Sequence, residues 1–575
     1  MRILLCALAL LLAPAAAHAE DVNAIAARYF AYFYFHYSPS AATQAGLHKY
    51  DVELEDYSAA AVQQQVELLH GFEKELGEPT EPDAKILLSN IRSQLLALEV
   101  IRNWEKNPDN YSSGVTGSIF GLMERPYAPA DVRLRAVIAR ERKIPQVFVE
   151  ARKNLKNPPR IFTEIALEQI DGIVHFFEND VPAAFADVQD YALKDQFAQS
   201  NAAVIRALKT YGAWMKSSLL PRSKGDYRLG AQMFRKKLLY DEMVDLPLDK
   251  LLDIAWTDLH KNQAEFARIA KEVDPSKSAS EVLAELATIH PAPDQLLSTF
   301  QETFASLIGF IRDHHIVTIP SDVQPVLEET PPFMRATTFA SMDSPGAFET
   351  KSTKAYFNVT LTQKDWTPQH IAEHMAAFNV GTITSTAIHE AWPGHYVQFL
   401  WLPQFPSTVR KLLGANTNVE GWAHYTEQMM LDEGYAAAPA DATPEQARTA
   451  RLIRLGQLQD ALLRDARFIN SIKLHTGQGE ASGSWSMEQA VELFVKEGYQ
   501  SRSVGLVETK RGTADATYLY YTLGKLMILK LREDVKAKQG AQFNLQAFHD
   551  SFMLQGPAPI PLIRKAMLQD DSPAL

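Results

Sequence analysis

The sequence is almost free of cysteine, because Cys6 is the only one among 575 residues. A single thiol excludes an intramolecular disulfide framework and a cluster of cysteine metal ligands. Cys6 also lies in an N-terminal segment that we expect to be removed during export, so the mature chain offers no cysteine nucleophile. Any metal site or nucleophilic chemistry therefore has to rely on other side chains.

Clusters of basic residues are also lacking. The chain has 57 Lys and Arg against 69 Asp and Glu, which gives a formal net charge of -12. Nucleic-acid binding depends on clustered Lys and Arg that contact phosphates, so we expect no nucleic-acid partner. The hydrophobic content of 46% and the charged content of 22% are ordinary for a globular protein.

Long apolar runs are confined to the N-terminus, "MRILLCALALLLAPAAAHAE". One Arg, a short apolar run and the ending Ala17-His18-Ala19 predict a secretory signal over residues 1–19, cleaved after Ala19. A membrane anchor is the alternative, but the run is short for one. Cys6 lies too far from the small residues to be a lipoprotein cleavage site. We expect a periplasmic or secreted protein with no stable membrane span after cleavage.

Most of the remaining chain shows helical periodicity. Apolar residues recur every three to four positions in four long segments, namely 82–104, 247–273, 443–475 and 518–535. No internal repeat and no clear domain boundary is visible. We predict a mainly α fold with one helical domain over 20–575, divided into an N-terminal helical subregion over 20–330 and a catalytic core over 331–575.

One short segment, "AYFNVTL", has the two-residue alternation of a β-strand. Tyr356, Asn358 and Thr360 share one face of it. The segment predicts a small β-sheet beside the helix that carries the motif described next. An extended peptide could add to the edge of this strand, which makes these three residues candidate substrate contacts. An internal strand without ligand contacts fits the same pattern.

Histidine and glutamate form the first chemical motif, in "TAIHEAWPGHYVQ". His389 and Glu390 begin the zinc-protease pattern H-E-x-x-H, in which two His residues one helical turn apart bind Zn²⁺ and the Glu is the general base. Pro393 stands where the second His is expected, and His395 follows two residues later. On a regular helix the two His would point about 120° apart, which does not suit a shared metal.

Pro393 and Gly394 can correct this spacing. Proline removes a helical hydrogen bond and clashes with the preceding turn, and glycine permits a wide range of backbone angles. We therefore predict a bulge that carries Ala391 and Trp392 outward and returns His395 beneath His389. Two unrelated polar residues near a kink remain the alternative when the motif is taken alone.

A third candidate ligand lies 25 residues after His395, in "NVEGWAHYTEQMM". Glu420, His424 and Glu427 fall on one helix face among apolar neighbours, and buried charges need partners or a metal. A solvated polar face is the alternative. We predict Glu420 as the third ligand, with His424 and Glu427 supporting the ligands from behind and His424 as an alternative ligand.

These stretches resemble a known family. "HEAWPGHYVQ" followed by "EGWAHYTE" resembles the bacterial domain-of-unknown-function 885 family, which is placed among zincin-like metallopeptidases. "SAATQAGLHKYD", "ASMDSPGAFETKSTKAYFNVT" and "TYLYYTLGKLMILKLRED" extend the resemblance over nearly the whole mature chain. The step from His395 to Glu420 is also similar to that of helical gluzincins such as the thimet oligopeptidases. The resemblance implies a large helical gluzincin-like fold with a deep substrate channel.

The resemblance also implies roles for individual residues. His389, His395 and Glu420 would bind Zn²⁺, and Glu390 would be the general base. The family often has Asp and Gly ahead of the Leu474-His475 pair, where this chain has Ser471 and Lys473, so the role of this segment stays open.

A hydrolase of this kind also needs a donor that stabilises the oxyanion formed from the carbonyl. Tyr521, Arg511 and His475 are the candidates. For Tyr521, an alternative is a packed tyrosine whose hydroxyl is satisfied within the fold.

The expected function is that of an exported zinc-dependent peptidase with a peptide substrate. Two alternatives remain: a non-catalytic protein that binds metal or peptide, and a zinc hydrolase of a non-peptide amide or ester. The sequence leaves the cleaved bond, the length of the substrate and the oligomeric state open.

Overall fold

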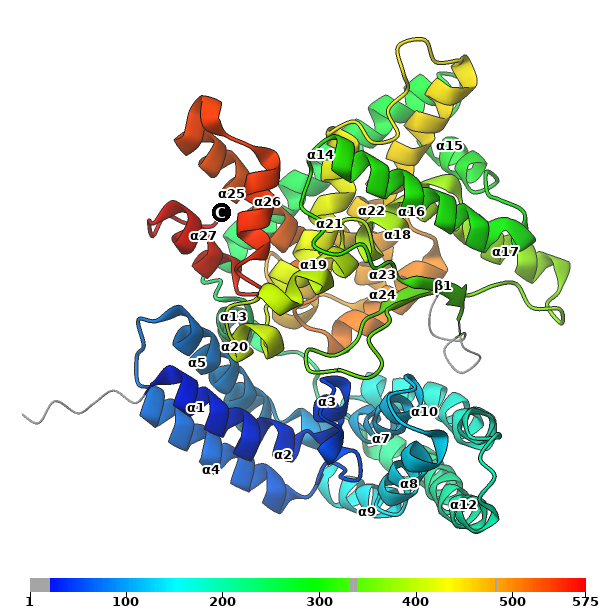
Figure 1. Cartoon of the computed structure of the whole chain (residues 1–575), viewed down its shortest axis with the longest axis vertical. Helices are drawn as coiled ribbons and strands as arrows, with labels where there is room; N and C mark the ends of the chain where they lie inside the picture. Colours follow the sequence, from blue (N-terminus) through cyan, green and yellow to red (C-terminus); the bar gives the residue numbers. More distant parts are fainter. Residues whose placement is uncertain (1–20, 331–334, 336–338, 481–482) are drawn as a thin grey trace, which may run out of the picture.

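Helices dominate the computed structural model, which describes residues 21–330, 335, 339–480 and 483–575 (Figure 1). The predicted signal over 1–19, including Cys6, lies outside these residues. Across the described part of the chain, no helix has both the length and the apolar character needed to cross a membrane. The predicted mainly α fold with a small sheet is confirmed.

The helices of the N-terminal half run from α1 to α16. Their bounds are α1 Val22–Arg28, α2 Phe35–Tyr37, α3 Pro39–Gln44, α4 Ala59–Leu76, α5 Pro82–Leu95, α6 Asn103–Lys106, α7 Asp109–Met123, α8 Ala130–Glu141, α9 Ile144–Asn154, α10 Arg160–His175, α11 Val181–Ala184, α12 Tyr191–Trp214, α13 Gly230–Glu242, α14 Leu248–Val273, α15 Ala279–Leu286 and α16 Leu296–Asp313.

The helices of the C-terminal half run from α17 to α27. Their bounds are α17 Pro368–Ala377, α18 Val380–Glu390, α19 His395–Trp401, α20 Thr408–Leu412, α21 Asn416–Asp432, α22 Pro444–Thr476, α23 Met487–Lys496, α24 Arg502–Ala514, α25 Tyr520–Gln539, α26 Leu545–Met553 and α27 Ile560–Leu568. The four long helices predicted from periodicity are confirmed as α5, α14, α22 and α25.

Local sequence explains the bounds of the longest helix, α22. Thr443 caps its N-terminus in a reciprocal pair with Gln446, and Pro444 occupies the first helical turn. Gly477 ends the helix in the left-handed conformation, with φ of 65°. The helix crosses the centre of the C-terminal half, beside α14 and α18 (Figure 1), so one rigid element supports both the core and the motif-bearing helix.

The sheet has three short strands, β1 (Val326–Glu329), β2 (Ala340–Asp343) and β3 (Tyr356–Val359), in the order β1-β3-β2. The predicted strand is confirmed as β3. It pairs with β1 in parallel and with β2 in the antiparallel sense, and its Phe357 ring packs against Phe300 and Phe304 of α16.

The prediction that β3 binds substrate along its edge is wrong. Both edges of β3 are already hydrogen-bonded to neighbouring strands, so a peptide has no free main chain to pair with beside Tyr356. Asn358 and Thr360 are buried, and Thr360 donates its backbone N–H to Phe339 instead. The strand of the sheet that lies beside α18 is β2.

The hydrophobic core divides differently from the predicted subregions 20–330 and 331–575. One cluster of buried residues lies within 111–219. The larger cluster combines helices from both ends of the chain, from Ile25 to Leu568. The N-terminal helices α1 to α5 therefore share a core with the C-terminal half. The smaller core belongs to a segment that follows them in the sequence, and Figure 1 shows its helices α7–α12 as a separate group beside α1–α5.

A close helix crossing joins α21 to α25. A Cβ atom placed on Gly524 would lie 2.0 Å from the Thr417 carbonyl oxygen, and one on Gly421 would lie 2.6 Å from the Gly524 Cα. Any larger residue would separate the two backbones. The glycines therefore bring α21, with its candidate ligand, against α25, which carries Tyr521.

Candidate metal centre

The two motif histidines lie on two separate helices. α18 ends at Glu390, and α19 begins at His395 after a break that includes a cis Trp392–Pro393 peptide. The chain thus breaks into two helices where we predicted a bulge, whereas the predicted return of His395 to His389 is confirmed, with ring centroids 4.8 Å apart. Ala391 and Trp392 are not carried outward, because both are buried in the core. On one regular helix the two histidines would point about 120° apart. The break removes this constraint, since each histidine takes its direction from its own helix.

Gly394 makes this break compact. Its backbone N–H donates to the Ile388 carbonyl at 2.9 Å, so the chain folds back on the last turn of α18. A Cβ at position 394 would lie 1.7 Å from the His389 carbonyl oxygen, which no other residue can accommodate. Trp422 of α21 donates its indole N–H to the Pro393 carbonyl at 2.8 Å and ties the break to the third motif helix.

The three predicted ligands converge on one atom. Glu420 Oε2 lies 3.4 Å from His389 Nε2 and 3.5 Å from His395 Nε2. This oxygen is buried, and no described residue gives it a hydrogen bond. A buried carboxylate oxygen without a partner is costly, so the arrangement calls for a cation or a proton among these three side chains.

The distances fit a tetrahedral zinc site. Ordinary N–H···O hydrogen bonds are about 2.9 Å long, shorter than both separations at Glu420. Two ligand atoms on a tetrahedral Zn²⁺ with bonds of about 2.0–2.1 Å would be about 3.3 Å apart. The donor set of two imidazoles and one carboxylate is also the set of several catalytic zinc sites, which leave a fourth position open.

Glu390 is the second carboxylate beside the histidines. One ligand atom each from His389, Glu390 and His395 lie within 4.8 Å of one another. Glu390 is only half-buried, whereas Glu420 aims a buried, unpartnered oxygen between the two rings. Glu420 is therefore the better candidate ligand, and the Glu390 carboxylate lies beside the two histidines.

A buried carboxylate orients His389 from behind. Glu427 Oε1 accepts from His389 Nδ1 at 2.6 Å, which turns Nε2 toward Glu420. His424 Nδ1 lies 3.2 Å from the other oxygen of Glu427, so His424 stands behind this carboxylate and its contacts favour the supporting position over that of a ligand. A partner of this kind fixes the tautomer and direction of a metal-binding histidine.

Electrostatics in this cluster follow from burial and pairing. Burial opposes the charged form of His389, yet the carboxylates of Glu420 and Glu427 raise its pKa to about 10. Burial opposes the charged form of Glu427 too, but Arg464 and the two histidines hold its pKa well below the usual range. Burial lowers the pKa of His424 to about 3. Burial opposes the charge of Glu420 as well, but His389 and His395 hold the pKa of this carboxyl well below its usual range. Both carboxylates are therefore anionic, and each faces a different nitrogen of His389.

Arg464 of α22 is a member of this cluster that sequence reasoning missed. Its Nη2 lies 3.0 Å from Glu427 Oε1 and 3.3 Å from His389 Nδ1. The available signal was that Asp460, Arg464 and Asp465 stand among apolar neighbours, in the stretch "QLQDALLRDARF" of α22. Nothing in the local spacing indicated that Arg464 would reach α18 and α21, because that contact depends on how the helices cross.

Tyr521 lies beside the cluster. Its ring centroid is 6.5 Å from that of His389, and the guanidinium carbons of Arg464, Arg467 and Arg511 lie 5.0–5.9 Å from the ring. Arg511 Nη2 donates to the Tyr521 hydroxyl at 3.4 Å. The predicted pair Tyr521 and Arg511 thus stands on the α24–α25 side of the cluster, where a hydroxyl and a guanidinium can donate hydrogen bonds.

His475 is not part of this cluster. It is buried, its Nε2 donates to the Gly512 carbonyl at 2.8 Å, and its ring contacts Tyr227 and Phe234. It lies eleven residues beyond Arg464 on the same helix, a distance of about 16 Å at about 1.5 Å per residue. The prediction that His475 is an oxyanion donor is therefore wrong.

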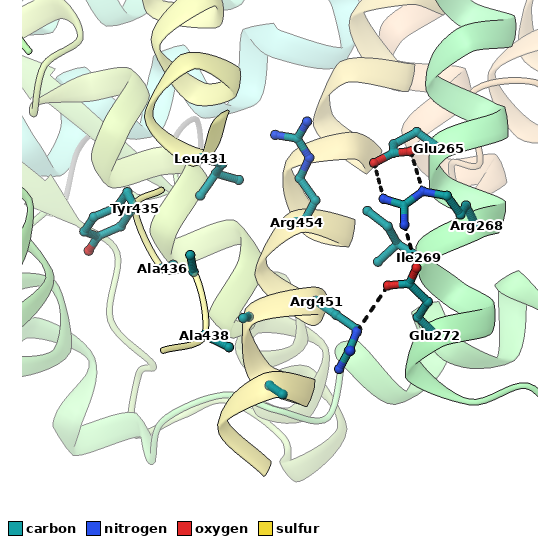
Figure 2. A pocket seen from close by; sticks show the side chains of 13 residues that line it. Glu265, Arg268, Ile269, Glu272, Leu431, Tyr435, Ala436, Ala438, Arg451 and Arg454 are labelled. Atoms are coloured by element: carbon teal, nitrogen blue, oxygen red, sulfur yellow. Dashed lines mark hydrogen bonds and ion pairs between the residues drawn. The ribbon is translucent and has the colours of Figure 1, made fainter. Parts of the chain in front are cut away.

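A separate cavity of about 330 Å³ lies between α14, α22 and the segment after α21 (Figure 2). None of the candidate metal ligands lines it. Its charged walls form ion pairs: Arg268 bonds Glu265 and Glu272, and Glu272 also bonds Arg451 at 3.3 Å (Figure 2). The pair of Glu272 with Arg451 connects α14 to α22, and the other two lie within α14, which indicates a structural role.

Known proteins agree with this architecture. The sequence profile described as "Bacterial protein of unknown function (DUF885)" matches residues 39–567. A solved structure described as "a putative lipoprotein of unknown function" from Shewanella oneidensis is 26% identical, with a TM-score of 0.78 over 95% of this chain and 98% of that chain. The "putative lipoprotein" from Colwellia psychrerythraea is 18% identical, with a TM-score of 0.74 over 93% and 96%, and shows the shared fold alone. No curated protein matches the chain.

Proposed function

We propose that this chain, which belongs to the bacterial DUF885 family of proteins of unknown function, is a zinc-dependent peptidase with a gluzincin-like fold. One observation carries the proposal: His389 and His395 both aim Nε2 at the buried, unpartnered Oε2 of Glu420, with Glu390 beside them. Two imidazoles, one carboxylate ligand and one adjacent carboxylate are the side chains that metal-dependent amide hydrolysis requires.

His389, His395 and Glu420 would hold the Zn²⁺ ion. When bound, the ion supplies Lewis acidity that polarises a carbonyl and lowers the pKa of water. Glu427 keeps Nδ1 of His389 occupied at 2.6 Å, so that Nε2 stays available as a ligand. Arg464 in turn balances the charge of Glu427 from 3.0 Å.

Glu390 is the proposed general base. It follows His389 directly at the end of α18 and is half-buried, so its carboxylate would lie beside a substrate bound at the metal. It would accept a proton from the attacking water and donate that proton to the amine that leaves. A general base has to lie close to the metal ligands and stay out of their coordination, which is the position that the half-buried Glu390 offers.

Tyr521 and Arg511 are the proposed donors to the oxyanion. The Tyr521 hydroxyl is held by Arg511 on one side of His389, and both side chains carry N–H or O–H groups that can turn toward negative charge. Donors placed in advance at this position stabilise charge as it develops on the carbonyl oxygen.

Export to the periplasm or the medium is part of the proposal. The N-terminal sequence has the form of a secretory signal, and both solved relatives are described as putative lipoproteins. Sequencing the N-terminus of the protein recovered from a cell-envelope or culture fraction tests this, and Glu20 is the expected first residue.

The function is tested by metal analysis and a peptide screen. Purified protein is expected to contain about one Zn²⁺ per chain and to cleave members of a mixed-peptide library, read by mass spectrometry. Glu390→Gln is expected to keep the zinc and to lose at least 100-fold in cleavage rate, in the range of general-base effects. Glu373→Gln, at an exposed position of α17, is the matched control and should cleave normally.

Three results would overturn the peptidase proposal. A wild-type cleavage rate in Glu390→Gln would show that Glu390 is not the general base. Stoichiometric zinc without cleavage of any peptide would favour a non-catalytic binding protein, or a hydrolase of other amides or esters if such substrates react. Purified protein without stoichiometric zinc would show that these residues do not form a zinc centre.

A further inference from the structure

An apolar cavity of about 380 Å³ adjoins the candidate metal centre, and His395 and Glu420 form part of its wall. The rest of the wall comes from α19 and the turn after it, from α21, from β2 and from the end of α26. Six of these residues carry large apolar side chains: Met342, Phe399, Leu402, Phe405, Phe552 and Met553. The cavity therefore adjoins two of the three residues that would hold the metal.

Few of the residues around this cavity carry charge. Among the described residues that line it, His395 and Glu420 are the only ones with ionisable side chains, and both would be occupied by the metal. The uncharged polar groups are the Ser344 hydroxyl and the Gln398 amide, and this amide already donates to Asn418 at 3.1 Å. A Lys, Arg, Asp or Glu side chain entering the cavity would lose water without gaining a partner, which is unfavourable.

The wall is held in place from behind. Asn418 donates its side-chain amide to the carbonyls of Gly556 and Ala558, at 3.2 and 2.8 Å. This fixes the segment after α26 against α21, so the cavity is formed in advance. Its volume corresponds to about a dozen waters at about 30 Å³ each, which is room for one aromatic or large aliphatic side chain.

We propose that this cavity binds the side chain of a substrate residue next to the scissile bond and selects large apolar residues, such as Phe, Leu and Met, over charged ones. The inference rests on the proposed peptidase function and defines its substrate class. The position of the cavity indicates this occupant. A substrate side chain in the cavity lies next to His395 and Glu420, so it belongs to a residue whose peptide bond lies at the metal.

A cleavage-site profile tests the inference on the full mature chain loaded with Zn²⁺. A mixed-peptide library is digested, and the residues on both sides of each cleaved bond are counted. One flanking position is expected to be enriched in Phe, Leu and Met and depleted at least tenfold in charged residues, as apolar pockets discriminate on this scale or more. A flat profile at both flanking positions would overturn the inference and leave the peptidase function standing.

Leu402→Lys provides the directed test. A cation in the wall is expected to shift the kcat/KM ratio of acidic to apolar residues at that position by about tenfold or more in favour of acidic residues. Leu554→Lys is the matched control, because Leu554 neighbours Met553, is 43% exposed and lies outside the cavity wall. It should leave the ratio unchanged.

The outcomes separate the two proposals. An unchanged ratio in a folded Leu402→Lys protein, verified by its circular dichroism melt, would overturn the cavity assignment. If this variant does not fold, Leu402→Gln is expected to reduce the preference for apolar residues in the same direction, and an unchanged preference there would also overturn it. Failure of the wild-type chain to cleave any peptide would instead contradict the peptidase function.

Discussion

Glu427 decides which nitrogen of His389 can bind a metal. Its carboxylate is completely buried and contacts His389, His424 and Arg464. The contact at His389 Nδ1 leaves only Nε2 for coordination. Three cationic or hydrogen-donating partners keep Glu427 ionised despite its burial, so it acts as a fixed negative charge behind the ligand.

Replacing Glu427 by Gln is expected to weaken Zn²⁺ binding by about 10- to 100-fold. The substitution keeps the shape of the side chain and removes the charge that holds Nδ1 of His389 and pairs with Arg464. Competition with a coloured chelator measures the affinity. Glu433→Gln, at an exposed position one residue beyond the end of the same helix, is the control, and equal affinities in the two variants would contradict the role given to Glu427.

Gly394 is expected to tolerate no larger residue. A Cβ there would overlap the backbone oxygens of Ile388 and His389, and backbone atoms in a helix cannot move aside. Gly394→Ala should displace the start of α19, move His395 away from Glu420 and destabilise the fold by about 1–3 kcal/mol. Metal content and thermal unfolding measure the two effects.

Gly117→Ala is the control for this substitution. Gly117 lies within α7, and a Cβ there meets no atom within 4 Å. Alanine is the better helix former by about 1 kcal/mol, so stability should stay constant or rise. A Gly394→Ala protein that keeps full zinc content would show that the helix break does not position His395.

At the scale of elements, α21 is anchored at its N-terminus by another helix. Glu242, the last residue of α13, accepts from the backbone N–H groups of Asn416 and Thr417 at 3.2 and 2.8 Å and from the Thr417 hydroxyl at 2.6 Å. A negative charge at a helix N-terminus is also favourable for the helix dipole. This anchor lies one turn before Glu420 and fixes the direction from which that carboxylate enters the site.

Glu242→Ala is therefore expected to lower the free energy of unfolding by about 1–3 kcal/mol, because it leaves buried donors without a partner. Fraying of the first turn of α21 should also weaken zinc binding. Both effects are best measured at pH 8, since burial raises the pKa of Glu242 to about 7. Glu533→Ala, at an exposed position on α25, should change neither quantity. Unaltered stability in Glu242→Ala would show that α21 is held by its packing alone.

At the scale of the whole molecule, the smaller core contains a buried acid. Glu141 is fully buried at the end of α8, and Ser200 of α12 donates to it at 2.5 Å. Burial raises its pKa to about 8, above the ordinary value near 4.5. The native state therefore keeps this proton at a pH where the unfolded chain has lost it.

The sign of the resulting pH dependence follows from this difference. The contribution of Glu141 to stability is fully present below about pH 4.5 and declines as the pH rises toward 8, because the native state has to bury an increasing fraction of charge. The side chain in Glu141→Gln cannot ionise, so the free energy of unfolding of this variant should decline less as the pH rises. Its stability relative to the wild type should increase by an amount on the order of a few kcal/mol over that range, at about 1.4 kcal/mol per pKa unit.

Urea unfolding of both proteins from pH 5 to pH 9 measures the slope. The buried Gln amide of the variant can change its free energy of unfolding by a constant amount. This amount is the same at each pH, so it does not affect the comparison of slopes. Glu178→Gln, at an exposed position in the same core region, should reproduce the wild-type slope. Parallel pH profiles for the wild type and Glu141→Gln would contradict a buried neutral Glu141.

Much of this architecture could be predicted from local sequence. Helices α14 and α22 follow directly from apolar periodicity, and the alternation of Phe357 and Val359 predicted β3. The grouping of His389, His395 and Glu420 also followed from their spacing and their family resemblance. In each case neighbouring residues along the chain carry the signal, so a single segment is sufficient to read it.

Contacts between distant segments could not be read in this way. Arg464 reaches Glu427 only because α22 crosses α18 and α21, and β3 became the central strand only because β1 and β2 flank it. His475 resembled a catalytic donor in sequence, yet the length of α22 places it far from the cluster. The smaller core within 111–219 likewise depends on which helices meet.

By itself, the sequence determined the helical class, the exclusion of cysteine chemistry, and the three side chains that could hold a metal, because composition and spacing are properties of the chain. The tertiary structure decided how those side chains meet. It replaced the expected bulge by a break at Gly394, set Glu427 and Arg464 behind His389, and placed an apolar cavity beside Glu420. These features depend on helix crossings and on backbone contacts between segments, which no local pattern encodes.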